Sequence, residues 1–195
     1  MKKLTPKNKI QTTNSFIESC LANSSSCDEF ISIASSEISD LAIEFYNRIG
    51  EIFNSLDLNI SVTREGDVNC RFDATLIDPN NSIPIEIKSP REDFEINIKA
   101  IRQAFENKIV LLSRGFYSTT PEATSLAIAF SYPPKRSDVY ELISDIKKAF
   151  SINIGIIDIN DLLYMVYEYK INRRIFNKEY LFNFFGKFDR EKAFS

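Results

Sequence analysis

The sequence predicts an α/β domain in which a mixed β-sheet of about five strands is flanked by helices, with a helical C-terminal extension. Three observations lead to this class. Apolar residues recur at helical spacing in three long segments, short apolar runs of strand length lie between them, and turn-forming residues separate the two kinds of segment. With 195 residues, 44% of them hydrophobic, the chain suffices for one domain with a substantial core.

The residue pattern in the first half of the chain predicts one long helix followed by three strands. Ser26 or Asp28 can cap a helix, and the apolar positions from Glu29 to Leu56 keep helical spacing over the whole segment. Residues 57–62 (DLNISV) have the composition of a first strand, and the polar residues 63–67 have that of a turn.

Further along the chain, helical and strand patterns alternate. Residues 94–111 carry an apolar stripe at helical spacing, which predicts a helix running into a short strand, Ile109 to Leu112. Continuous apolar runs at 126–130 and 152–157 predict buried strands, because strands covered on both faces lack alternation. A helix from Ser137 to Phe150 separates them, and a last element covers 162–169. We therefore divide the chain into a polar N-terminal segment (1–25), a core (26–169) and an extension (170–195).

Composition excludes several classes of protein and of site. No apolar run approaches the ~20 residues that span a bilayer, and no apolar segment follows the basic N-terminus as in a signal peptide. The three cysteines (Cys20, Cys27 and Cys70) form no CxxC pair and the chain has no histidine, so we expect no zinc site and a reducing, cytoplasmic location. Any hydrolysis must rest on carboxylates and lysine.

Two strands at 72–77 and 83–88 carry charged residues that a purely structural strand would lack. Asp73 lies in the first, and Glu86 and Lys88 lie in the second, where alternation puts both on one face. If the strands pair as a hairpin around the polar turn 78–82, Asp73 can approach Glu86. Two carboxylates that close cost free energy unless a cation lies between them, and Mg²⁺ is the hard cation that carboxylate oxygens suit.

This constellation resembles the PD-(D/E)xK nuclease superfamily, which includes most type II restriction endonucleases. The matching residues are Asp73 and Glu86-Ile87-Lys88, and Phe72 stands where the motif has proline. The resemblance implies that Asp73, Glu86 and the carbonyl of Ile87 hold one or two Mg²⁺ ions, for which Mn²⁺ can substitute. It also implies that Lys88 orients or activates the attacking water and stabilises charge on the phosphate.

The resemblance also suggests accessory residues. Some members add an acid from the first helix to the metal site, and Glu44 or Glu51 could serve; the alternative is that both are solvated. The helix after the lysine strand often places polar side chains near the scissile phosphate. Lys99, Arg102 and Gln103 are therefore candidate phosphate contacts, and a plain solvated face is the alternative.

The pattern Glu-x-Lys has little value by itself, because it occurs three times. Glu106-Asn107-Lys108 lies in a helical pattern, and Glu168-Tyr169-Lys170 can be the solvated end of an element. Only Glu86-Ile87-Lys88 lies on a strand that directly follows an acid-bearing strand. The structural alternative is a surface Glu–Lys pair on an edge strand, with which Pro84 is consistent.

The extension, residues 170–195, differs from the body in charge and in aromatic content. It has seven Lys or Arg residues against three acids, whereas the whole chain has a net charge of −3. Such asymmetry suggests a basic tail that meets a polyanion. Its interleaved aromatic residues can stack on bases, bury against the body or form a dimer contact: Phe176, Tyr180, Phe182, Phe184, Phe185 and Phe188.

Two classes of function fit the sequence. The first is a Mg²⁺-dependent endonuclease acting on double-stranded DNA, expected to be a type II restriction enzyme that works as a homodimer; a repair, recombination or junction-resolving nuclease would share the same residues. The second is a non-catalytic DNA-binding subunit that keeps the fold. The recognition sequence is not encoded in any spacing, since base readout depends on which loops reach a groove.

Overall fold

The computed structural model describes residues 15–38, 42–63, 72–115 and 117–194. Its elements, in chain order, are α1 (Phe16–Ala22), α2 (Cys27–Glu37), α3 (Ala42–Ser55), β1 (Ile60–Val62), β2 (Ala74–Leu76), β3 (Ile83–Ile87), α4 (Ile98–Arg114), β4 (Ser125–Ala129), α5 (Asp138–Phe150), β5 (Ile154–Asp158), α6 (Ile159–Lys170), α7 (Lys178–Asn183) and β6 (Gly186–Lys187). The expected turn at 63–67 and Cys70 fall largely outside the described residues, as do residues 1–14.

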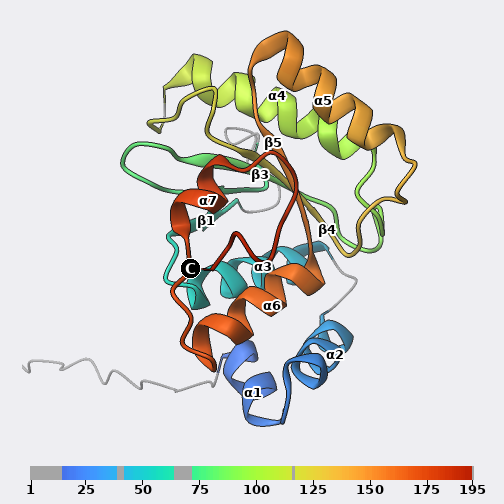
Figure 1. Cartoon of the computed structure of the whole chain (residues 1–195), viewed down its shortest axis with the longest axis vertical. Helices are drawn as coiled ribbons and strands as arrows, with labels where there is room; N and C mark the ends of the chain where they lie inside the picture. Colours follow the sequence, from blue (N-terminus) through green and yellow to red (C-terminus); the bar gives the residue numbers. More distant parts are fainter. Residues whose placement is uncertain (1–14, 39–41, 64–71, 116, 195) are drawn as a thin grey trace, which may run out of the picture.

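The strands form one mixed sheet in the order β1-β2-β3-β4-β5-β6. β1, β2 and β3 pair antiparallel, whereas β3, β4, β5 and β6 run parallel. α4 and α5 cover one face of this sheet and α3 and α6 cover the other (Figure 1). The predicted class, a mixed sheet flanked by helices, is confirmed.

The structure differs from the prediction in three places. The single helix expected from Glu29 to Leu56 is two helices, α2 and α3, which keep a common apolar spacing because both pack on one core. The strand expected at Ile109 to Leu112 is the last part of α4, where only Leu111 is buried and Gly115, with φ 62°, ends the helix. The sheet also has a sixth strand, β6, which the sequence did not predict because two residues are too few to show a pattern.

Side chains of the expected residue types cap several helices. Ser26 caps α2, Asn97 caps α4 and Ser137 caps α5, each by accepting a hydrogen bond from a backbone N–H of the first turn. Asp158 ends β5 and caps α6 in the same way. The caps of α4, α5 and α6 fix where each of these helices begins after the strand that precedes it.

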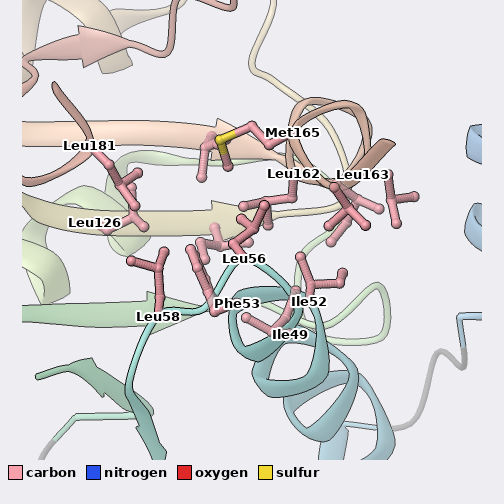
Figure 2. Close-up of a cluster of buried hydrophobic side chains, with 14 of the residues drawn as sticks. Ile49, Ile52, Phe53, Leu56, Leu58, Leu126, Leu162, Leu163, Met165 and Leu181 are labelled. Carbon is pink, nitrogen blue, oxygen red and sulfur yellow. The ribbon is translucent and has the colours of Figure 1, made fainter. Parts of the chain in front are cut away.

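The core consists of two apolar clusters, one on each face of the sheet. Figure 2 shows the larger one, where buried side chains of α3 and α6 meet over the sheet and Leu181 of α7 approaches Leu126 of β4. The smaller cluster joins α4 and α5 to β4 and β5. α1, which lies within the N-terminal segment 1–25, adds Phe16, Ile17 and Cys20 to the larger cluster.

The C-terminal extension is packed against the body. Phe176, Phe182, Phe184 and Phe188 are buried in the larger cluster, whereas Phe185 is 44% exposed. A Cβ atom at Gly155 would lie 2.4 Å from Cζ of Phe184, so glycine allows this ring to reach the sheet. Two cations of the extension pair with acids of the body: Arg174 lies 3.4 Å from Glu168 and Arg190 lies 2.5 Å from Asp161. These contacts support burial against the body over base stacking for most of the aromatic residues.

None of the helices in the described ranges is both long and apolar enough to cross a bilayer.

Candidate active site

The candidate site lies where the ladder between β2 and β3 ends. Ala74 pairs with Ile85, so the antiparallel register would place Phe72 opposite Ile87, but β2 begins only at Ala74. The side chain of Asp73 replaces the missing strand partner: its Oδ2 accepts a hydrogen bond of 2.8 Å from the backbone N–H of Ile87. The predicted approach of Asp73 to the Glu86-Ile87-Lys88 strand is therefore present.

Glu86 and Lys88 point to the face of the sheet that α4 covers. Lys88 Nζ lies 2.7 Å from Glu86 Oε1, and Asn107 Nδ2 of α4 donates a 2.9 Å hydrogen bond to Glu86 Oε2. The two residues are only 4% and 5% exposed, and β3 lies inside the sheet between β2 and β4. The alternative of a surface ion pair on an edge strand is therefore wrong.

Burial of two neighbouring carboxyl groups shapes the electrostatics of this site. Burial, together with the charge of Glu86, raises the pKa of Asp73 from 3.8 to about 7, against the opposing effects of the Ile87 N–H and of Lys88. Burial also raises the pKa of Glu86, although its bonds to Lys88 and Asn107 work in the other direction. In the absence of a cation, this pair of acids holds negative charge only at a cost in free energy.

The lysine of the site stays positively charged at neutral pH. Burial by itself would lower the pKa of Lys88, but the ion pair with Glu86 and the charges of Asp73 and Glu92 outweigh burial, and the net effect raises it. Lys88 is thus suited to donate hydrogen bonds and to stabilise negative charge. It is not suited to accept a proton from water.

A cavity of about 360 Å³ opens at these residues. Its lining comprises Tyr46, Asp73, Glu86, Lys88, Glu92, Gln103, Glu106, Asn107 and Val110. Four carboxylates and one ammonium group therefore face one space, which favours a bound cation. Oε1 of Gln103 is buried without a hydrogen-bond partner in the described part of the chain, as expected of an oxygen that meets a water or a ligand.

The structure brings some of the predicted site residues together and leaves others apart. Asp73, Glu86, Lys88 and Gln103 line the cavity, and the backbone of Ile87 is bonded to Asp73 beside it. Lys99 and Arg102 lie on the exposed face of α4 and are not among the lining residues. Glu44 is exposed on α3 and Glu51 pairs with Arg48 at 2.9 Å, so neither acid lines the cavity.

Five lining residues were not foreseen from the sequence: Tyr46, Glu92, Glu106, Asn107 and Val110. Glu92 stands three residues after Ser89, a spacing at which a glutamate side chain can bond back to the serine, and this could have drawn attention to it. Glu106 and Asn107 belong to the triplet Glu106-Asn107-Lys108, whose helical pattern gives no sign of a site. Nothing in the sequence distinguishes Tyr46 from the other aromatic residues of its helix.

The donor atoms of the site suit Mg²⁺ or Mn²⁺. Two carboxylates and the Ile87 carbonyl are hard oxygen ligands, and Mg²⁺ in proteins is held by one or two carboxylates while it keeps several waters. Over residues 15–38, 42–63, 72–115 and 117–194, no three acidic, cysteine or histidine side chains lie close enough together to bind one ion directly. An ion held by two carboxylates and a carbonyl would keep waters in its remaining coordination positions, as Mg²⁺ usually does.

Comparison with known proteins places the fold. No family model and no curated protein matches this sequence. A solved structure of restriction endonuclease FokI is similar, with a TM-score of 0.56 and 12% sequence identity over 84% of this chain. The chain has a restriction-endonuclease-like fold. It corresponds to about 30% of the length of FokI.

Proposed function

We propose that this chain is a PD-(D/E)xK nuclease that hydrolyses phosphodiester bonds of double-stranded DNA with Mg²⁺, acting in the cytoplasm as a homodimeric type II restriction endonuclease. The observation that carries the proposal is the convergence of Asp73, Glu86 and Lys88 on one cavity at the end of β3. The restriction-endonuclease-like fold supports it. Glu86 lies on β3, and Asp73 and Lys88 directly flank the paired strands β2 and β3, as the resemblance to the superfamily motif leads us to expect.

In this proposal Asp73, Glu86 and the Ile87 carbonyl hold the divalent ion. When bound, the ion polarises a phosphoryl oxygen and lowers the pKa of its water. Asn107 holds Oε2 of Glu86 through its 2.9 Å hydrogen bond, and Lys88 holds Oε1 through the 2.7 Å ion pair. Lys88, kept protonated by these acids, stabilises the negative charge that develops on the phosphate as water attacks phosphorus.

The bond that breaks joins phosphorus to the 3′ oxygen. The attacking water loses a proton to solvent and the 3′ oxygen gains one, so the products are a 5′-phosphate and a 3′-hydroxyl. That polarity follows from the superfamily resemblance.

The test is cleavage of plasmid and phage DNA with Mg²⁺ by the wild type, Asp73→Ala and Lys88→Ala. Asp145→Ala and Lys148→Ala serve as matched controls, because both residues are exposed on α5, with side chains 63% and 74% accessible. Discrete fragments that disappear with EDTA and in both site variants, but not in the controls, are expected.

Other outcomes separate the alternatives. A featureless smear with the same losses would indicate a repair or recombination nuclease of the same superfamily. Binding of DNA without cleavage of linear or branched duplexes would contradict the enzyme and favour a non-catalytic subunit.

A further inference from the structure

One acid of the cavity, Glu92, lies outside the superfamily motif and is held unusually firmly. It sits in the turn between β3 and α4, four residues after Lys88. Its Oε2 accepts hydrogen bonds of 3.0 Å from both the backbone N–H and the hydroxyl of Ser89. The backbone N–H groups of Glu92 and Asp93 in turn bond to the carbonyl of Ser89, so the turn is closed on itself.

A third donor reaches the same oxygen from the opposite side of the sheet. The hydroxyl of Tyr46, on α3, lies 3.2 Å from Glu92 Oε2 and 3.2 Å from the carbonyl oxygen of Ile87. A phenol has one proton, so it can donate to only one of these acceptors at a time. Tyr46 thus connects the carbonyl expected to ligate the metal with the carboxylate of Glu92.

Folding by itself does not require this arrangement. Glu92 is an exposed residue, and water could satisfy its carboxylate at no cost in stability. Three protein donors directed at one exposed oxygen instead hold this carboxylate in the cavity that Asp73 and Glu86 also line. An exposed carboxylate that is held in one cavity with other acids points to a role in binding a cation there.

The grouping of the acids indicates how Glu92 can act. In the described part of the chain no three acids are close enough to share one ion, so Glu92 is not a direct ligand together with Asp73 and Glu86. It nevertheless lines the same cavity. Since Mg²⁺ keeps several of its waters, a carboxylate at this place can accept hydrogen bonds from them.

We propose that Glu92 is a third carboxylate of the metal centre that binds water molecules of the divalent ion, and that Tyr46 is the positioning residue that orients it. This inference rests on the proposed function only in requiring that the cavity bind a divalent ion.

The test measures Mn²⁺ binding to the full chain by electron paramagnetic resonance of the free ion, without DNA. Glu92→Gln is expected to raise the dissociation constant about 10-fold, and Tyr46→Phe by a factor of about 3 to 10. The double variant should bind no more weakly than Glu92→Gln, because the two residues act as one unit. Glu92→Asp, which keeps the charge but shortens the side chain, should also bind more weakly.

Glu95→Gln and Tyr140→Phe are the matched controls. Glu95 is exposed in the same connection. The hydroxyl of Tyr140, on α5, donates a hydrogen bond to the Pro133 carbonyl. Both controls should stay within twofold of the wild type. Water-proton relaxation by bound Mn²⁺ should change in Glu92→Gln and not in the controls, which a merely structural role would not produce.

The outcomes are distinguishable. Unchanged Mn²⁺ affinity in Glu92→Gln, in a wild type that binds and cleaves, would overturn this inference and leave the proposed function standing. Unchanged affinity in Tyr46→Phe together with weaker binding in Glu92→Gln would remove the positioning role of Tyr46. Failure of the wild type itself to bind Mn²⁺ would overturn both the inference and the proposed function.

Discussion

Replacing Asp73 by asparagine is expected to stabilise the metal-free protein at alkaline pH while it abolishes metal binding and cleavage. The carboxyl group is buried beside Glu86, and its pKa is raised from 3.8 to about 7. Asparagine has nearly the same shape and keeps an oxygen that can accept the hydrogen bond from the Ile87 N–H. The substitution therefore removes a buried charge without leaving that backbone donor unpaired.

The magnitude follows from the raised pKa. Between pH 3.8 and about 7 the folded state binds more protons at Asp73 than the unfolded state. The stability that the neutral carboxyl group provides is therefore present in full below pH 3.8 and is lost as the pH rises through about 7. At pH 8 the cost of the charge is at most about 4 kcal/mol, and at pH 5 it is below about 2 kcal/mol. The increase in the free energy of unfolding produced by Asp73→Asn should therefore be larger at pH 8 than at pH 5.

The assay is urea unfolding in EDTA at pH 5 and pH 8, with Asp145→Asn as the exposed control. Addition of Mn²⁺ should then stabilise the wild type by mass action and leave Asp73→Asn unchanged. A variant that is less stable than the wild type at pH 8, or whose gain is equal at both pH values, would refute the view that Asp73 is held charged at a cost. A variant stabilised by Mn²⁺ as much as the wild type would refute its place in the metal site.

Three further predictions concern the surroundings of the site and the core. Burial lowers the pKa of Lys108 to about 7, so the stability of the wild type should rise between pH 7 and 10.5. Lys108→Met should remove this pH dependence. In urea unfolding at pH 7 its free energy of unfolding should increase by about 2–4 kcal/mol, a figure that already includes the loss of the hydrogen bond to Thr119. Gly155→Ala should cost about 2–3 kcal/mol, because the new Cβ meets Phe184 and Thr124, and Phe184→Leu should restore part of it; an unchanged melting temperature would contradict the close approach. Asn107→Leu should lower the cleavage rate about 10-fold and cost about 1–3 kcal/mol of stability, because the buried carboxylate of Glu86 loses a donor that orients it. An unaltered rate would assign Asn107 to packing alone.

Local chemistry explains what the sequence by itself determined. The fold class and most helix and strand positions follow from apolar periodicity and caps, which depend on residues close together in the chain. Asp73, Glu86 and Lys88 could be singled out because charged residues within apolar strands are uncommon, and a short turn between two strands restricts how they can pair. Their approach was therefore foreseeable, although the aspartate bonds a backbone N–H, a detail that no pattern contains.

Tertiary structure decided the features that depend on where separate elements meet. Tyr46 comes from a helix about forty residues before the site, and its hydroxyl reaches Ile87 and Glu92 because α3 packs on the face of the sheet opposite α4. The split of the first predicted helix, the burial of Lys108 and the addition of β6 likewise arise from packing. Periodicity shows which side of an element is apolar, but not which element packs against that side. The free energy of burial depends on the apolar area removed from water and not on how far apart the buried residues are in the sequence.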